Sequence, residues 1–173
     1  MKFYSGFSLI NESYLFKEYI NTSEYTICGF SYGAIKAFKK VQESLELSHR
    51  VDTLQLFSPA FFQSKATKFK RLQMMAYTKN KDLYMNQFIK SCFSPYEKKI
   101  VQNTATTSDE LEELLNYEWD LDKLKYIASA GVKIEVYLAE EDKIIDSLSA
   151  KEFFLNVATV TYIKNANHFL QTI

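Results

Sequence analysis

The chain has 173 residues, of which 47% are hydrophobic and 16% aromatic, and its formal net charge is zero. This length supports one domain with its own core, and the apolar content argues against disorder. Zero net charge gives no overall electrostatic support for nucleic-acid binding. No run approaches the roughly 20 apolar residues of a membrane span. No signal peptide is visible and the two cysteines form no disulfide framework, so we expect a reduced, cytoplasmic setting.

Predicted strands and helices alternate along most of the chain. The expected strands are residues 2–4, 25–28, 51–57, 131–139 and 157–163. Helices are expected after Asn11-Glu12-Ser13 up to Ile20, from Gly33 to about Leu45, and from Ser147 to Leu155. Between about residues 60 and 126 the sequence is helix-prone, aromatic and charged, with no convincing strand. This pattern predicts an α/β fold of about five mainly parallel strands with flanking helices, formed by residues 1–59 and 127–173. Residues 60–126 would form a helical lid insert over the C-terminal ends of the strands.

The sequence Gly29-Phe30-Ser31-Tyr32-Gly33 lies between a β-prone apolar run and a helix-prone run. Gly-x-Ser-x-Gly in this setting is typical of the nucleophile elbow of α/β hydrolases, although the five residues alone are common by chance. Side chains at Gly29 or Gly33 would collide with the neighbouring strand and helix. We therefore expect Ser31 at the apex of a strained turn, where it would be the nucleophile.

A serine hydroxyl needs an adjacent base to become a nucleophile at neutral pH. The chain has two histidines. His49 lies in a polar connection between a helix and a strand, where a solvated loop residue is the favoured interpretation. His168 follows the last expected strand, and it is therefore the candidate base.

An acid should hold this imidazole in the correct tautomer. Asp142 follows the strand that ends at Ala139, and it is the first choice; Asp146 is the second. Glu140 and Glu141 are less favoured, and an acidic cluster after a strand is usually only a solvated turn. The chain order Ser31, Asp142, His168 matches that of the α/β hydrolases.

Two backbone N–H groups are candidates for an oxyanion hole. The Tyr32 N–H follows the nucleophile and starts a helix, and the Phe7 N–H lies in the loop after the first strand, where Gly6 keeps the turn narrow. The histidines and cysteines give no metal-ligand spacing, and no glycine-rich phosphate loop or dinucleotide motif is present. We therefore expect neither a metal nor a cofactor.

The first part of the expected insert is basic, with aromatic residues between the cations. Such a lid suggests an acyl chain that is delivered by an acidic carrier. A solvated helix face over a local core explains the same pattern equally well, and docking on a membrane surface is a weaker alternative. The candidate residues for the substrate and its carrier are Lys68, Lys70, Arg71, Phe57, Phe61 and Phe62, and Arg71 is favoured most among the cations.

Several segments together carry a resemblance that extends over essentially the whole chain. They are Phe3-Tyr4-Ser5-Gly6-Phe7, the elbow up to Ala37, Leu56-Phe57-Ser58-Pro59, Phe69-Lys70-Arg71-Leu72-Gln73, residues 131–136 and Asn167-His168-Phe169-Leu170-Gln171. This set resembles the BioV family, the small pimeloyl-acyl-carrier-protein methyl ester esterases of Helicobacter-like bacteria. The resemblance implies a minimal α/β-hydrolase fold in which Ser31, Asp142 and His168 are the triad. It also implies release of methanol from the methyl ester in biotin biosynthesis, with acyl-carrier protein held by the basic lid.

One departure from the wider α/β-hydrolase plan is the short region before the nucleophile, where only one strand and one helix are expected. One face of the sheet would then be thinly covered, which would leave an apolar surface exposed or covered by a homodimer. Two other functions remain open. The protein could be a carboxylesterase or thioesterase for another acyl substrate, or an inactive hydrolase fold that only binds acyl-carrier protein.

Overall fold

A computed structural model describes the whole chain, residues 1–173, and its centre is one parallel sheet. Five strands follow one another in the order β1-β2-β3-β4-β5. Their bounds are β1 (Lys2–Tyr4), β2 (Thr26–Phe30), β3 (Thr53–Phe57), β4 (Lys133–Ala139) and β5 (Thr159–Ile163). The predicted α/β class and the five strands are confirmed, and four strands begin one or two residues later than expected.

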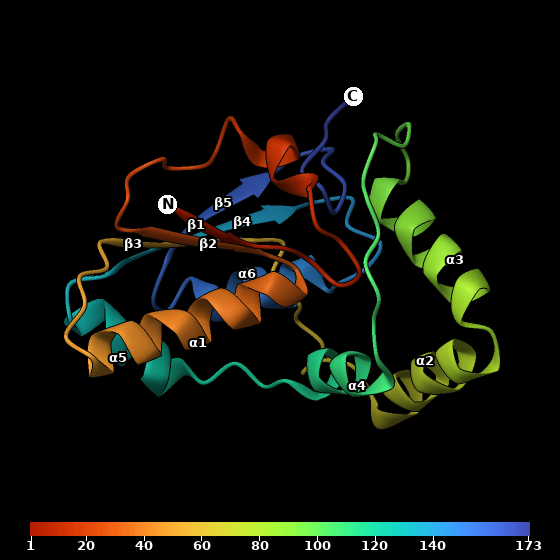
Figure 1. Cartoon of the computed structure of the whole chain (residues 1–173), viewed down its shortest axis with the longest axis horizontal. Helices are drawn as coiled ribbons and strands as arrows, with labels where there is room; N and C mark the ends of the chain where they lie inside the picture. Colours follow the sequence, from red (N-terminus) through yellow and green to blue (C-terminus); the bar gives the residue numbers. More distant parts are fainter.

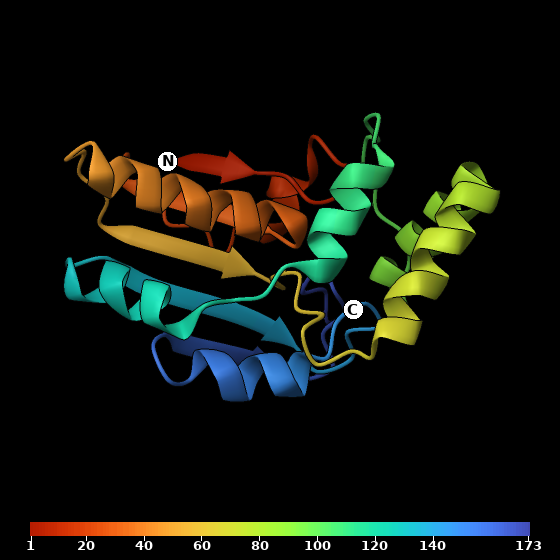
Figure 2. The same ribbon diagram turned by 90° about the horizontal axis from the view of Figure 1, so that it is seen from below.

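Three helices cover one face of this sheet, as Figures 1 and 2 show. They are α1 (Tyr32–Glu46), α5 (Leu121–Ser129) and α6 (Ser147–Phe154). In α1 the buried side chains Ala34, Phe38 and Val41 recur at helical spacing and face the sheet. Leu54 and Leu56 of β3 belong to the same core. This packing fixes α1, and with it the turn that precedes the helix.

The opposite face is covered by a much smaller element, η1 (Glu12–Phe16), a single 3-10 turn. The predicted helix up to Ile20 does not form. The chain turns away after η1, so that the carbonyl oxygen of Tyr19 and the N–H of Asn21 reach the side-chain amide of Gln55, at 2.9 and 2.8 Å. Phe16 is fully buried and fills this side of the sheet.

Where no helix covers that face, a polar network closes it. The Gln55 side chain is 1% exposed, and its Nε2 also donates to Glu135 Oε2 at 2.8 Å. The Tyr137 hydroxyl donates to the same carboxylate at 3.2 Å. On β5 the register neighbours of Glu135 and Tyr137 are the exposed residues Thr159 and Thr161. The part of the thinly covered face that these residues form is therefore polar.

Three more helices lie beyond the C-terminal ends of the strands (Figure 2). They are α2 (Thr67–Lys79), α3 (Lys81–Phe93) and α4 (Ser108–Asn116), and we call them the lid. The predicted boundary at residue 126 falls inside α5, which packs beside α1 under the sheet and not with the lid. None of the helices combines the length and the hydropathy that crossing a bilayer requires.

The connection between α3 and α4 holds the loop that follows β1. Thr104 donates its N–H to the carbonyl oxygen of Ser8 at 2.8 Å, and Gln102 donates its N–H to Asn11 Oδ1 at 2.7 Å. Leu9 and Asn103 form an antiparallel bridge between these two contacts. A segment of the lid region is thus attached to a loop of the core.

Candidate active site

Ser31 lies at a sharp turn between β2 and α1. Its φ angle is 52°, in the left-handed region that non-glycine residues rarely adopt. The Ser31 N–H donates to the carbonyl oxygen of Phe57 at 2.9 Å, and the Ala60 N–H donates to the Ser31 carbonyl at 3.1 Å. A Cβ atom at Gly29 would overlap the carbonyl of Gly33, and a Cβ atom at Gly33 would overlap the carbonyl of Tyr4. The turn therefore requires glycine at both positions.

His168 connects this serine to an aspartate. Its Nε2 lies 3.1 Å from Ser31 Oγ, and its Nδ1 lies 2.7 Å from Asp142 Oδ2. The side chains of His168 and Asp142 are fully buried. The second oxygen of Asp142 accepts the N–H groups of Ile144 and Ile145, at 2.8 and 3.1 Å, which orients the carboxylate toward the imidazole. Three residues far apart in sequence are thus joined by hydrogen bonds.

The residue before His168 fixes the histidine loop. Asn167 is fully buried, and its Nδ2 donates to the carbonyl oxygen of Phe93 and to Gln171 Oε1, both at 2.8 Å. Its Oδ1 accepts the N–H groups of Phe169 and Gln171, at 3.0 and 3.1 Å. Every hydrogen-bonding site of this amide is used. The last residue of α3 and the histidine loop therefore hold each other in place.

The other candidate acid and the other histidine lie elsewhere. Asp146 caps α6, where its Oδ1 accepts the Ser149 N–H at 3.1 Å and its Oδ2 accepts the Ser149 hydroxyl at 2.8 Å. The bond from the Ser149 N–H is the main reason that the pKa of Asp146 is lowered, and the bond from the Ser149 hydroxyl lowers it further. His49 is exposed at the end of α1. Asp142, the first choice from the sequence, is thus the aspartate bonded to His168, whereas Asp146 caps a helix.

The two proposed oxyanion donors are free. Neither the Phe7 N–H nor the Tyr32 N–H donates to an acceptor within the protein. The two aromatic rings meet edge to face, with centroids 6.3 Å apart. The Tyr32 hydroxyl donates to Glu113 of α4, which also pairs with Lys39 of α1. The residue that follows Ser31 is therefore in contact with both the β1 loop and the lid.

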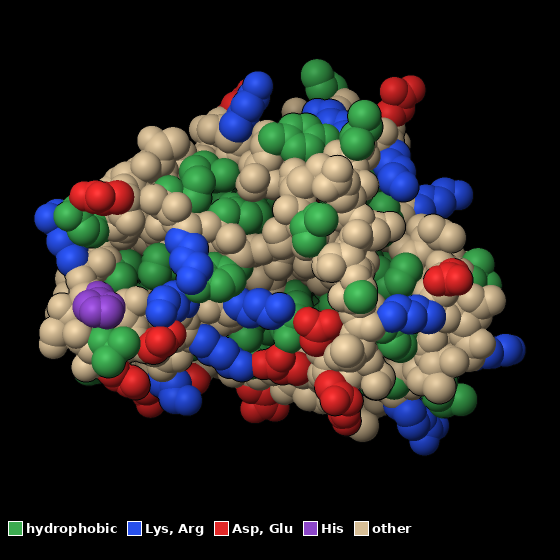
Figure 3. Space-filling model, in the orientation of Figure 1, with side chains coloured by type: hydrophobic (Ala, Val, Ile, Leu, Met, Phe, Trp, Pro, Cys, Tyr) green, Lys and Arg blue, Asp and Glu red, His purple; other side chains and the backbone are tan.

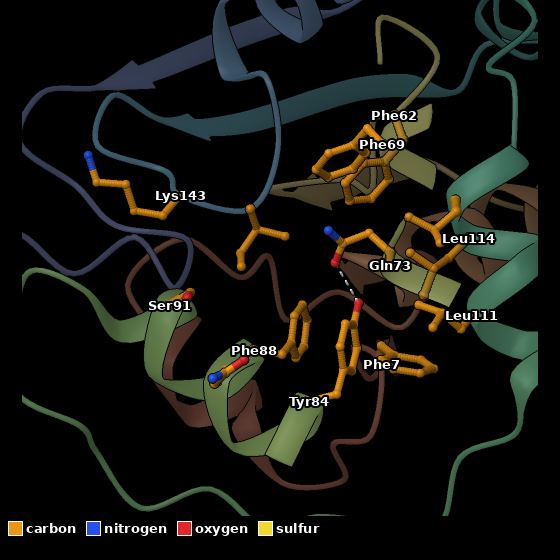
Figure 4. Close-up of a pocket in the computed structure, with 13 residues that line it drawn as sticks. Phe7, Phe62, Phe69, Gln73, Tyr84, Phe88, Ser91, Leu111, Leu114 and Lys143 are labelled. Carbon is orange, nitrogen blue, oxygen red and sulfur yellow. Dashed lines mark hydrogen bonds between the residues drawn. The ribbon is translucent and has the colours of Figure 1, made fainter. Parts of the chain in front are cut away.

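A cavity of about 270 Å³ lies between the lid and the core (Figure 4). Phe7 lines it from the β1 loop, and Ile144 from the loop that carries Asp142. Gln73 and Tyr84 face each other within it, and the Tyr84 hydroxyl donates to Gln73 Oε1 at 3.1 Å. The rest of the apolar wall comes mainly from the lid: Phe62, Phe69, Phe88, Leu111, Leu114 and Leu115. Ser31 does not line the cavity, and it is only 4% exposed.

The predicted substrate and carrier residues are only partly brought together. Phe62 lines the cavity, whereas Phe57 is buried in the sheet core against Phe16, and Phe61 packs on α6 against Phe153. The placement of Phe57 follows from strand alternation, because it shares the face of Gln55, away from α1. Lys68, Lys70 and Arg71 lie on α2, and none of them forms an ion pair.

The sequence matches no family model, and no curated protein matches it either. Solved structures do resemble it. BioG from Haemophilus influenzae has 10% identity and a TM-score of 0.57, with 97% of this chain and 87% of that chain covered. The naproxen esterase of Bacillus subtilis has 20% identity and a TM-score of 0.51, and an esterase from Exiguobacterium antarcticum has 16% and 0.59. These two matches cover 85% and 83% of this chain, which spans only 54% and 59% of theirs.

The fold is that of the α/β hydrolases.

Within this α/β-hydrolase fold, sequence reasoning missed the contribution of α4. Leu111, Leu114 and Leu115 recur at the spacing of one helix face, a signal that was present in the sequence. Glu113, one residue before Leu114, binds the Tyr32 hydroxyl and the Lys39 ammonium group. Figure 3 shows lysine and acidic side chains side by side where α1 meets α4. The lid of the hydrolase fold is thus attached to the elbow helix by charge as well as by apolar contact.

Proposed function

We propose that this protein is a serine esterase whose catalytic residues are Ser31, His168 and Asp142, and whose substrate is the methyl ester of pimeloyl-acyl-carrier protein. The observation that carries the proposal is the hydrogen-bonded chain from Ser31 Oγ through His168 to Asp142, beside two backbone N–H groups that have no acceptor in the protein. A nucleophile, a base, an orienting acid and oxyanion donors are the parts that acyl transfer needs.

In this mechanism Ser31 Oγ attacks the ester carbonyl while His168 Nε2 takes the hydroxyl proton. Asp142 accepts the Nδ1–H and stabilises the imidazolium. The N–H groups of Phe7 and Tyr32 donate to the tetrahedral oxyanion. Collapse breaks the bond to the methoxy oxygen, which leaves as methanol with the proton from His168. Water then attacks the acyl-enzyme, with His168 again the base, and releases the free carboxylate and Ser31.

The cavity and the cations of α2 support the choice of substrate. The cavity walls are mostly apolar, as an acyl chain requires, and they begin at the Phe7 loop. Lys68 and Arg71 are exposed without an acidic partner, so their charges are available to an acidic carrier protein. The pimeloyl methyl ester itself comes from the resemblance to the BioV family, and the likeness to BioG over 97% of the chain supports the fold.

Methanol release from pimeloyl-acyl-carrier-protein methyl ester tests the proposal. We expect Ser31→Ala and His168→Ala to lower kcat by about 10⁴-fold or more, because the nucleophile and its base act as a unit. His49→Ala is the matched control and should retain full activity, since His49 is exposed and remote from the serine. Labelling of Ser31 by a fluorophosphonate without methanol release would indicate another acyl substrate. Folded protein that is not labelled would indicate a fold that only binds.

A further inference from the structure

Glu12 is a buried carboxylate that the mechanism above does not use. It is fully buried in η1, yet it forms none of the ion pairs of this chain. Burial raises the pKa of Glu12 more than its hydrogen bonds lower it. A buried carboxylate without a cation lowers the stability of the fold.

One carboxylate oxygen of Glu12 is bonded to the loop after β1, and the other, Oε2, has no partner within the protein. Glu12 Oε1 accepts the N–H of Gly6 at 2.7 Å. The carbonyl oxygen of Gly6 accepts the Leu9 N–H at 3.1 Å. Gly6 is therefore held at both its N–H and its C=O.

The peptide unit between Gly6 and Phe7 is the one that matters for catalysis, because its N–H belongs to Phe7. In a trans peptide the C=O and the N–H point in opposite directions, so fixing the Gly6 carbonyl also fixes the direction of the Phe7 N–H. The position must be glycine, because a Cβ atom there would lie 2.7 Å from the buried ring of Phe30. Glycine is the residue least able to hold a backbone direction by itself, and the bond from Glu12 supplies that restraint.

We propose that Glu12 is a positioning residue that holds the Phe7 N–H in the oxyanion hole by anchoring Gly6. This inference rests on the proposed esterase function, and it concerns the geometry of the acceptor oxygen rather than its charge. The two possibilities separate experimentally, because glutamine keeps the reach and loses the charge, whereas aspartate keeps the charge and loses the reach.

The test compares Glu12→Gln with Glu12→Asp on 4-nitrophenyl butyrate. We expect Glu12→Asp to lower kcat about 10- to 100-fold with little change in KM, since a misplaced oxyanion donor costs transition-state binding. Glu12→Gln should keep kcat within about threefold of the wild-type value. A trifluoromethyl ketone forms a tetrahedral adduct with serine. Its inhibition constant for Glu12→Asp should rise by about the factor by which kcat falls. Glu18→Asp, the same shortening at an exposed glutamate, is the matched control.

Several results would overturn the inference. If the aspartate variant matches the wild type, or if the glutamine variant falls as far as the aspartate variant, Glu12 does not act by position. A loss of kcat without a matching loss of ketone affinity would place the effect outside the oxyanion hole. Thermal unfolding of each variant identifies misfolded protein, and if Glu12→Asp does not fold, a loss of kcat in folded Glu12→Gln still overturns it. Wild-type protein without esterase activity or fluorophosphonate labelling would instead contradict the proposed function, and this inference with it.

Discussion

At the scale of single residues, two aspartates four positions apart have different surroundings. Asp142 is bonded to His168, and Asp146 caps α6. We expect Asp142→Asn to lower kcat by about 10⁴-fold, because an amide donor at this position favours the wrong imidazole tautomer. Asp146→Asn should leave kcat unchanged, since asparagine is as good a helix cap as aspartate. Steady-state kinetics of the two variants on one ester decide the matter, and similar losses in both would contradict the assignment of the acid.

At the scale of elements, we expect the contact between α1 and α4 to depend on pH. The hydrogen bond from Lys39 lowers the pKa of Glu113 below its ordinary value, and the bond from the Tyr32 hydroxyl is the next largest cause. A depressed pKa means that the ionised carboxylate stabilises the fold at neutral pH, and that this contribution is lost as the pH falls through the folded-state pKa. We expect Glu113→Gln to lower stability by about 0.5 kcal/mol at pH 7, the scale of an exposed ion pair.

The measurement is the midpoint of thermal unfolding between pH 3 and pH 7. The difference between wild type and Glu113→Gln should be largest at neutral pH, should begin to fall near the ordinary glutamate pKa of about 4.3, and should be lost only below the lower folded-state pKa. Glu112→Gln changes the neighbouring residue of the same helix, where the carboxylate has no bond, and should have little effect. A difference that persists unchanged at pH 3 would show that the charge of Glu113 is not what attaches α4.

The elements around the site show which parts of the structure could be predicted from the sequence and which could not. The elbow around Ser31 was predictable, because its two glycines and the flanking runs are local signals. The positions of His168 and Asp142 followed from the rule that the C-terminal ends of parallel strands share one edge. The position of the cavity wall formed by Leu111 and Leu114 could not be predicted, because it depends on how α4 packs across the strand ends. η1 ends before the predicted residue Ile20 because the side chain of Gln55, distant in sequence, forms hydrogen bonds with the backbone that follows it.

At the scale of the whole molecule, helices cover one side of the sheet and a polar network closes part of the other. We expect Gln55→Leu to lower the free energy of unfolding by about 3 kcal/mol, because it leaves the Asn21 N–H, the Tyr19 carbonyl and Glu135 without this partner. Glu135→Gln keeps an acceptor for Gln55 and should cost less. Urea unfolding followed by circular dichroism measures both variants, and a neutral or stabilising Gln55→Leu would show that apolar packing alone closes this face.

The bridge between Leu9 and Asn103 has a consequence for engineering. For the proposed esterase, exchanging the lid for that of a known hydrolase is a natural route to new substrate specificity, and the obvious cut sites are the ends of the three lid helices. Because residues 102–104 also support the turn around Phe7, a graft that replaces them would change the proposed oxyanion hole along with the cavity. Chimeras that retain these three residues from the parent should therefore keep their turnover, whereas chimeras that discard them should bind esters and hydrolyse them slowly.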